Sequence, residues 1–411
     1  MQKITWQRSL VALVLLAGIV LTGARPVQAA DAGAVFTPGP PMQVARELFN
    51  MAALPGGQVA VFGGRTYPGA ALAKAEIWDP ASNLFTSYNM NFSHHFSDLA
   101  KLADGDFLLL SGEGNNAETF HPGANTFTPT AGHPAYARIY GHAATLSSGK
   151  VLVVGGNSLD AATYGEVFDP ATGTFTPTLT LHTPRALPLV LPCNDGSAVV
   201  LGGRSTTDPI IEYERVELYD PVSNSFSILQ EQLFPGDPGW GIMGYVWGNG
   251  VYYLNPVETQ RLQDGRYLLL AKKGLVPYTL FTFDPATKAI AKFTTTPDFP
   301  DYTHFALSCY PVVDAARNKA YLLNTDNHSG GFINVRLYTV DLATGRRNDP
   351  TGSFHLGSFL NEFGVTLLAD GRLFLAGGDE VVNLAVQSTN KTWFIKPTGS
   401  PVRSMGLLLL D

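Results

Sequence analysis

Charge and cysteine are both scarce in this chain of 411 residues. Charged side chains make up only 15% of it, the formal net charge is −7, and no run of basic residues occurs. Such a chain does not attract a polyanion by bulk electrostatics, which argues against a nucleic-acid partner. The two cysteines, Cys193 and Cys309, could be joined in an exported protein. They fall in different, non-adjacent copies of the repeat described below, so we expect two separate buried thiols.

Long hydrophobic runs are absent beyond residue 30. The segment from Leu10 to Leu21 is apolar, but it is only about a dozen residues long, whereas a spanning helix needs roughly 20. Lys3 and Arg8 precede it, and Val27-Gln28-Ala29 follows with small residues where a signal peptidase cuts. We therefore predict a signal peptide over residues 1–29 and a secreted or periplasmic protein with no membrane span after cleavage. An uncleaved membrane anchor is the alternative.

Motifs for catalysis or metal binding are also missing. No nucleophile elbow, phosphate-binding loop, His-Glu-x-x-His motif or Asp-rich calcium loop is found. Four histidines suggest a metal site by residue type alone: His94, His95, His142 and His304. They would have to converge from separate repeats and show no ligand spacing. We predict no metal and no cofactor.

Turn-forming residues are plentiful and occur in a repeat. The chain contains 42 glycines and 28 prolines beside 45% hydrophobic residues, which is typical of an all-β fold. In each copy, two apolar strands flank a tight turn, and a second turn follows downstream that in most copies carries Asp-Pro between aromatic residues. The clearest copies are MAALPGGQVAVFGG (51–64) with IWDPASNLF (77–85), LAKLADGDFLLLSG (99–112) with TFHPGANTF (119–127), AATLSSGKVLVVGG (143–156) with VFDPATGTF (167–175) and VLPCNDGSAVVLGG (190–203) with LYDPVSNSF (218–226). Weaker copies cover 260–290 and 310–347, and the pattern recovers in a seventh copy at 365–402.

Each part of the repeat has a physical reason. Asp-Gly turns supply the positive φ of a tight hairpin. Strands covered on both faces read as unbroken apolar runs. In the downstream turn, the aspartate bonds forward to the backbone, the proline restricts φ and the glycine takes the left-handed corner. We expect the flanking aromatic residues to pack against the neighbouring repeat.

The repeat resembles the Kelch family of β-propellers over nearly all of the chain after residue 29. Its marks are glycine pairs at 63–64, 155–156, 202–203 and 377–378, at a spacing close to the roughly 50 residues of a Kelch repeat. The resemblance implies an all-β, Kelch-type β-propeller over 30–411 with seven four-stranded blades; six is the alternative. Because Kelch rings close with a strand from one terminus, Ala34–Pro38 is expected to complete the last blade. The tail Leu407–Leu410 competes for that place.

A propeller of this kind holds ligands at the mouth of its central channel. The candidate catalytic residues there are Arg46, Arg138, Tyr140, His142, Arg185 and His304. The candidate ligand-binding residues are Glu47, Arg65, His94, His95, Arg204, Trp240, Trp247, Glu258 and Glu362. Arginine holds carboxylates through two hydrogen bonds, so the ring suits a polar or acidic ligand. The alternative is that the ring is structural, because Kelch repeats often carry Arg or His before the innermost strand.

One insertion interrupts the repeat at about 235–256. Asn249-Gly250 between aromatic residues is a strong hairpin signal. Trp240 and Trp247 in this segment could stack on sugar rings over the channel. The alternative is a hairpin that packs its aromatic side chains against the propeller.

These features favour a binding function. We predict a monomer that binds a carbohydrate or an extracellular protein at the channel mouth. One alternative is an epimerase or lyase acting on a sugar acid, with arginines as a carboxylate clamp and His142, His304 or Tyr140 as base. Another is a structural envelope or adhesion protein. A copper radical oxidase is disfavoured, because the residues around Cys193 and Cys309 do not match that family's motif.

Overall fold

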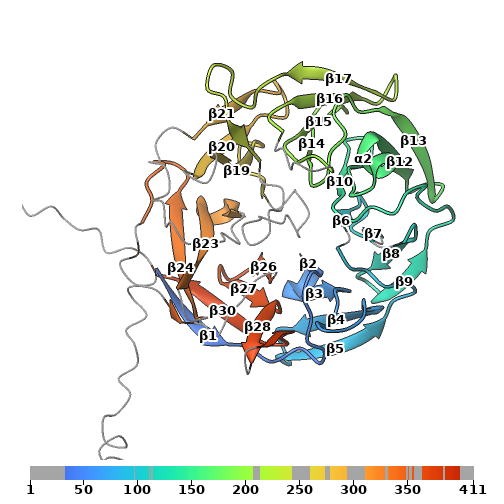
Figure 1. The fold of residues 1–411 in the computed structure, drawn as a ribbon. Helices are drawn as coiled ribbons and strands as arrows, with labels where there is room; N and C mark the ends of the chain where they lie inside the picture. The colour runs from blue at the N-terminus through green and yellow to red at the C-terminus, as the bar shows by residue number, and fades with distance from the viewer. Residues whose placement is uncertain are drawn as a thin grey trace, which may run out of the picture.

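The computed structural model describes thirteen parts of the chain. They are residues 33–96, 98–110, 112, 114–206, 213–242, 260–273, 278–293, 311–328, 332–348, 350, 354–355, 363–382 and 385–398. Within them, seven four-stranded antiparallel sheets are arranged in a ring around a central axis, as Figure 1 shows. The fold is therefore a seven-bladed β-propeller, and the predicted fold class is confirmed. The predicted signal peptide and the tail Leu407–Leu410 lie outside the described residues.

The first four blades each consist of four strands that are consecutive in the sequence. Blade 1 contains β2 (Asn50–Ala53), β3 (Val59–Phe62), β4 (Lys74–Asp79) and β5 (Leu84–Asn89). Blade 2 contains β6 (Asp98–Lys101), β7 (Phe107–Leu110), β8 (Ala117–His121) and β9 (Thr126–Pro129). Blade 3 contains β10 (His142–Thr145), β11 (Val151–Val154), β12 (Tyr164–Asp169) and β13 (Thr174–Thr180), with helix α2 (Leu159–Thr163) before β12. Blade 4 contains β14 (Leu189–Pro192), β15 (Ala198–Leu201), β16 (Val216–Asp220) and β17 (Ser225–Gln230).

The last three blades follow the same plan with additions. Blade 5 contains β18 (Trp240–Gly241), β19 (Tyr267–Lys273), β20 (Tyr278–Phe283) and β21 (Ile290–Lys292). Blade 6 contains β22 (Val312–Asp314), β23 (Lys319–His328), β24 (Phe332–Asp341) and β25 (Phe354–His355). Blade 7 contains β26 (Gly364–Leu367), β27 (Leu373–Ala376), β30 (Thr392–Pro397) and β1 (Ala34–Pro38). A separate hairpin, β28 (Asp379–Val382) and β29 (Ala385–Ser388), lies between β27 and β30 in the sequence.

The ring closes through its first strand. β1 pairs antiparallel with β30, with Ala34 opposite Pro397 and Pro38 opposite Trp393. Figure 1 shows this N-terminal strand beside the C-terminal strand at the outer edge of blade 7. The closing role that the sequence predicts for Ala34–Pro38 is confirmed. Pairing of two segments far apart in the sequence ties the start of the chain to the last blade and so holds the ring closed.

Burial on both faces explains the apolar second strands. All four residues of β3, β7, β11 and β15 are buried, because each blade packs against a blade on either side. Aromatic side chains fill the spaces between blades, as predicted. The Trp78 ring of blade 1 stacks on Phe374 of blade 7, with ring centroids 5.0 Å apart. Phe62 of blade 1 packs on Phe107 of blade 2 at 6.4 Å.

The Asp-Pro turns form as the sequence predicts, with one difference. The carboxylate of Asp79 accepts a hydrogen bond from the backbone N–H of Ala81, and Asp220 accepts one from Val222. The left-handed corner is glycine only in some blades. Asn83 and Asn224 hold it in blades 1 and 4, at φ of 54° and 51°. Asparagine tolerates this conformation better than other residues with a side chain, so the repeat does not require glycine here.

The glycine pairs bring neighbouring blades into close approach. A Cβ on Gly63 would lie 2.1 Å from the carbonyl oxygen of His94 in blade 2. A Cβ on Gly202 would lie 2.6 Å from Cβ of Ile242, next to β18 of blade 5. Both glycines also have positive φ. The first glycine of a pair is thus required for two reasons, its backbone conformation and the contact with the next blade.

Blade 5 differs from the sequence-based interpretation. The repeat pattern placed the first two strands of this blade within 260–274. In the structure the innermost strand described is β18, which pairs with β19 through Trp240 opposite Lys273. An isolated bridge between Arg261 and Tyr267 continues the pairing on the far side of the insertion. The insertion therefore falls within the inner edge of the blade. Of the predicted hairpin at 235–256, only residues up to 242 are described.

No helix in the described ranges is long and apolar enough to cross a membrane.

Candidate functional site

A buried ion pair ties the inner loop of each of three blades to its third strand. The arginine lies ahead of the innermost strand and the glutamate lies in the third strand. The pairs are Arg46–Glu76 at 2.6 Å, Arg138–Glu166 at 2.8 Å and Arg185–Glu217 at 2.6 Å. Each guanidinium also donates to the first carbonyl of the glycine pair, at Gly63, Gly155 or Gly202. Because these contacts recur, we call the three arginines and His94 the blade staples.

His94 takes the arginine's place in blade 2. Its Nε2 lies 2.8 Å from Oε1 of Glu118, and both side chains are fully buried. The same carboxylate accepts hydrogen bonds from the backbone N–H groups of Asn91 and Phe92. Burial opposes the charged form of Glu118, but the bonds from His94 and Asn91 outweigh it and lower the pKa. Arginine and histidine thus fill one structural position, which organises the loop leading to the inner strand.

The blade staples are not open to a ligand. Arg46 and Arg185 have no exposed surface and Arg138 exposes 3%. Their guanidinium groups are occupied by glutamate and by backbone carbonyls of the same blade. The hypothesis that Arg46, Arg138 and Arg185 clamp a substrate carboxylate is not supported by these positions. The burial of these three arginines agrees instead with the alternative that the polar residues before the innermost strands are structural.

Two residues after each blade staple, the backbone has a strained, left-handed conformation. Leu48, Phe96, Tyr140 and Leu187 all have positive φ, at 54°, 48°, 67° and 55°. Each lies two residues before the innermost strand of blades 1 to 4. Left-handed backbone is costly for bulky residues and persists where the surrounding structure imposes it. In blades 2 and 3 the residue held this way is aromatic and partly exposed at the channel mouth.

Two arginines and three aromatic side chains contact one another in a row across this mouth. The guanidinium of Arg65 lies 5.1 Å from the ring centroid of Tyr67 and 5.9 Å from that of Phe96. The Phe96 and Tyr140 rings meet edge to face at 4.9 Å. The guanidinium of Arg204 lies 5.9 Å from the Tyr140 ring. These five residues form a continuous band across blades 1 to 4, which we call the mouth band.

Backbone pairing positions the two arginines of the band. Arg65 follows β3 and lies across from Glu47, and Arg204 follows β15 and lies across from Ala186. Nε of Arg65 is 2.5 Å from Oε1 of Glu47, whose side chain is only 1% exposed. Burial raises the pKa of Glu47, and Arg65 partly offsets that rise. Arg65 itself remains 30% exposed, so it can contact both Glu47 and a ligand.

The hairpin of β28 and β29 borders the band beside Tyr67. The backbone N–H of Tyr67 donates to Oγ of Ser388 at 2.5 Å, and the N–H of Ser388 donates to the carbonyl of Tyr67 at 3.1 Å. The phenol ring of Tyr67 stays 43% exposed. Val382 and Val386 of the hairpin are also exposed. An apolar and aromatic surface therefore continues from blade 1 onto blade 7.

His142 contributes to the framework of the channel. It is the first residue of β10, and its Nδ1 accepts a hydrogen bond from the backbone N–H of Val190 in blade 4 at 3.3 Å. Asp98, the first residue of β6, likewise accepts from the backbone N–H of Ala143 in blade 3. Complete burial lowers the pKa of His142 to about 4. A base with so low a pKa and an occupied Nδ1 is poorly suited to abstract a proton near neutral pH.

The other site residues predicted from the sequence lie outside the mouth band or outside the residues that the structure describes. His95 is buried, with its ring 4.3 Å from that of Phe96. Trp240 is 4% exposed and packs edge to face on Phe234 at 5.6 Å. Its indole N–H donates to Asp237, so the ring lies in the core and not over the channel. Trp247, Glu258, His304 and Glu362 lie outside the described residues.

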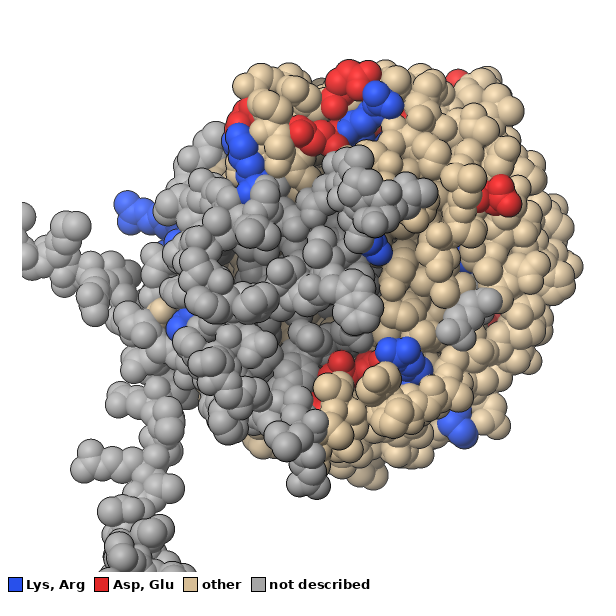
Figure 2. Space-filling view, viewed as in Figure 1, with Lys and Arg blue, Asp and Glu red and all other residues tan. Residues whose placement is uncertain are grey.

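Sequence reasoning missed two members of the band, Phe96 and Tyr67. Phe96 could have been found, because it occupies the same position after its staple as Tyr140 does. Tyr67 lies in the loop after β3, and the matching position after Gly202-Gly203-Arg204 is Thr206, so no repeat signal marked an aromatic residue there. Figure 2 shows that the visible described surface of this face is largely uncharged, with isolated charged side chains.

The described ranges contain no group of three or more His, Cys, Asp or Glu side chains that could hold a metal ion. Cys193 is buried and its thiol pKa is raised, mainly by burial. Cys309 and His304 lie outside the described residues, so their pairing and ligand roles stay predictions.

The fold and the mouth band define a seven-bladed propeller with a polar and aromatic channel mouth. No protein-family model matches the chain, and no curated protein matches its sequence. Among solved structures it is similar to a fungal alcohol oxidase of the AA5 family in complex with copper. The TM-score is 0.57 over 88% of this chain and 76% of that one, at 16% sequence identity. This likeness shows the fold alone. The prediction against a copper radical oxidase stays a prediction.

Proposed function

We propose that this protein is a secreted or periplasmic Kelch-type propeller that binds a carbohydrate at the mouth band. The observation that supports binding most directly is the continuous row of rings and guanidinium groups from Tyr67 to Arg204. Export rests on the signal peptide predicted for residues 1–29, and the Kelch assignment rests on the glycine pairs.

The chemistry of the band suits a sugar. Ligand sites combine aromatic walls with a few polar groups that orient the ligand. The exposed ring of Tyr67 offers a flat apolar face for the C–H face of a pyranose. Arg65 can keep its bond to Glu47 and still donate other N–H groups to sugar oxygens. The strained loops at Phe96 and Tyr140 hold their rings in place, so little side-chain entropy is lost on binding.

Catalysis on a sugar acid is not supported as well. The arginines predicted as a carboxylate clamp are blade staples, and His142 is a buried neutral acceptor. Tyr140 is the described candidate base that lies at the mouth, and its ring contacts Phe96 and Arg204. An extracellular protein partner and a structural envelope or adhesion role remain alternatives that the following experiment separates from carbohydrate binding.

A glycan array probed with the purified protein, followed by calorimetric titration of the bound glycan, tests the proposal. Tyr67→Ala should weaken binding by about tenfold, because it removes the exposed stacking face. Tyr67→Phe keeps the ring and should bind nearly as well as the native protein. Tyr88→Ala is the matched control, since Tyr88 lies on the outermost strand β5 of the same blade.

Two outcomes would contradict the proposal. One is the absence of glycan binding at millimolar concentration. The other is a Tyr67→Ala variant that binds its glycan as tightly as Tyr88→Ala does. Circular dichroism of each variant confirms that the fold is retained.

A further inference from the structure

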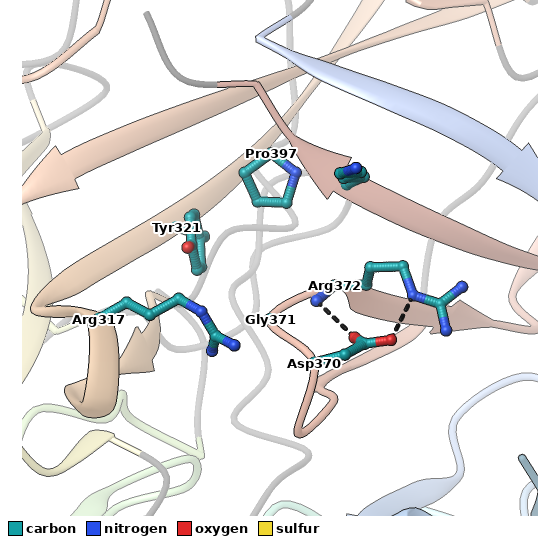
Figure 3. Close-up of a pocket in the computed structure, with 7 residues that line it drawn as sticks. Arg317, Tyr321, Asp370, Gly371, Arg372 and Pro397 are labelled. Atoms are coloured by element: carbon teal, nitrogen blue, oxygen red, sulfur yellow. Dashed lines mark hydrogen bonds and ion pairs between the residues drawn. The ribbon is translucent and has the colours of Figure 1, made fainter.

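A second candidate site lies at the opposite end of the blades, between blades 6 and 7. A cavity of about 410 Å³ opens there, lined by the turn after β22, the turn between β26 and β27, and the end of β30. The mouth band lies where innermost strands begin, whereas this cavity lies where they turn back into second strands. Figure 3 shows Arg317 extending from blade 6 towards Gly371 and Asp370 of blade 7.

Arg317 is held against the blade 7 turn. Its Nη1 lies 2.9 Å from Oδ2 of Asp314, a carboxylate with 1% exposure. Its Nη2 donates to the carbonyl of Ala369 at 3.3 Å. A Cβ on Gly371 would lie only 2.6 Å from Cζ of Arg317, and Gly371 has a φ of 88°. Glycine at this turn therefore makes room for the guanidinium, which still exposes 43% of its surface.

Two further cations line the same cavity. Nε of Arg372 lies 2.7 Å from Oδ2 of Asp370, and its guanidinium lies over the ring of Phe394 at 4.5 Å. Lys396 is exposed on β30 and has no ion-pair partner among the residues that the structure describes. Three cations thus line the cavity together with one carboxylate, Asp370, while Asp314 pairs with Arg317 without lining the cavity itself. This local excess of positive charge occurs in a chain whose net charge is −7.

The cavity combines this charge with an apolar wall. Tyr321 and Pro397 line one side of it, and Tyr321 is 4% exposed. A volume of about 410 Å³ lies in the range of small-molecule sites. Arginine forks match the geometry of a carboxylate.

We propose that the cavity between blades 6 and 7 binds an organic anion of monosaccharide size, with its carboxylate held by Lys396 and Arg372. A hexuronate has the required charge and size. This site is separate from the mouth band, so its existence does not depend on the proposed function.

Ligand-observed NMR titration of the whole protein tests the proposal with D-galacturonate and its neutral analogue D-galactose, at constant ionic strength. We expect galacturonate to bind with a millimolar Kd and galactose to show no saturation. Lys396→Gln should weaken binding about tenfold by removing one charge-assisted hydrogen bond. Arg372→Lys keeps the charge but loses the fork, and should weaken binding as well.

The matched control is Lys74→Gln. Lys74 is exposed at the start of β4 in blade 1, and its substitution removes the same charge from the chain. Equal weakening in Lys396→Gln and Lys74→Gln would indicate bulk electrostatics and overturn the proposal. Equal binding of galactose and galacturonate would overturn it too. Loss of galacturonate binding in Tyr67→Ala, with none in Lys396→Gln, would place the anion at the mouth band and refute this site.

Discussion

Replacing His142 by asparagine should make the propeller more resistant to acid with little effect near neutral pH. His142 is buried at the start of β10, and its Nδ1 accepts the backbone N–H of Val190. An asparagine side-chain oxygen can accept the same bond. Asn50 occupies the corresponding first position of β2 in blade 1, so the fold already accommodates this residue there.

The direction of the effect follows from proton binding. Burial lowers the pKa of His142 to about 4 in the folded protein, whereas an unfolded histidine titrates near 6.5. As the pH falls below about 6.5, the unfolded chain takes up a proton that the folded chain does not. The free energy of unfolding therefore falls between about pH 6.5 and pH 4. From about pH 8 to pH 5 the loss due to this residue is about 2 kcal/mol.

Urea unfolding followed by tryptophan fluorescence at the two pH values measures this difference. The native protein should lose about 2 kcal/mol more than His142→Asn between them. The other titrating groups are the same in both proteins, so their contributions cancel in the comparison. Parallel losses in the two proteins would refute the reasoning, because they would show that His142 keeps an ordinary pKa or is protonated in the folded state.

Two further predictions concern the framework of the blades. Arg185→Met should reduce the free energy of unfolding by about 3–5 kcal/mol, because it leaves the buried carboxylate of Glu217 without its cation. Arg266→Gln breaks the exposed pair with Asp264 and should cost less than about 1 kcal/mol; similar urea midpoints for the two variants would contradict the staple assignment. Gly202→Ala should lower the calorimetric Tm far more than Gly236→Ala. Both glycines have positive φ, but only the Cβ at 202 would clash, 2.6 Å from Ile242, while nothing lies within 4 Å at 236. Equal Tm shifts would show that backbone conformation alone decides the cost.

The fold could be predicted in detail because its determinants are local and repeated. The apolar second strands, the Asp-Pro turns and the glycine pairs each recur at a spacing that defines one blade. The closing strand was also recognisable, since Ala34–Pro38 resembles the outer-strand segments at Thr126 and Thr174. Blade 5 was assigned less well, because an insertion separates the two parts of its inner edge and β18 contains only two residues.

The site was harder to predict, because residue type does not reveal which neighbours a side chain meets. Arg46 and Arg65 are both arginines near the channel mouth, yet Arg46 is buried against Glu76 and Arg65 stays 30% exposed. Trp240 and Tyr67 were equally plausible stacking residues by composition. Packing against Phe234 places Trp240 in the core, and pairing with Ser388 leaves the Tyr67 ring exposed.

The sequence by itself determined that the chain is an all-β propeller of repeated blades, because hairpin turns and two-sided burial are encoded within each repeat. The tertiary structure decided between seven blades and six, and showed Ala34–Pro38 as the strand that pairs with β30 to close the ring. Only the tertiary structure decided which polar residues serve the framework and which are open to a ligand. Staples, mouth band and the cavity between blades 6 and 7 all depend on contacts between segments far apart in the chain. Those contacts form only when the ring brings the segments together.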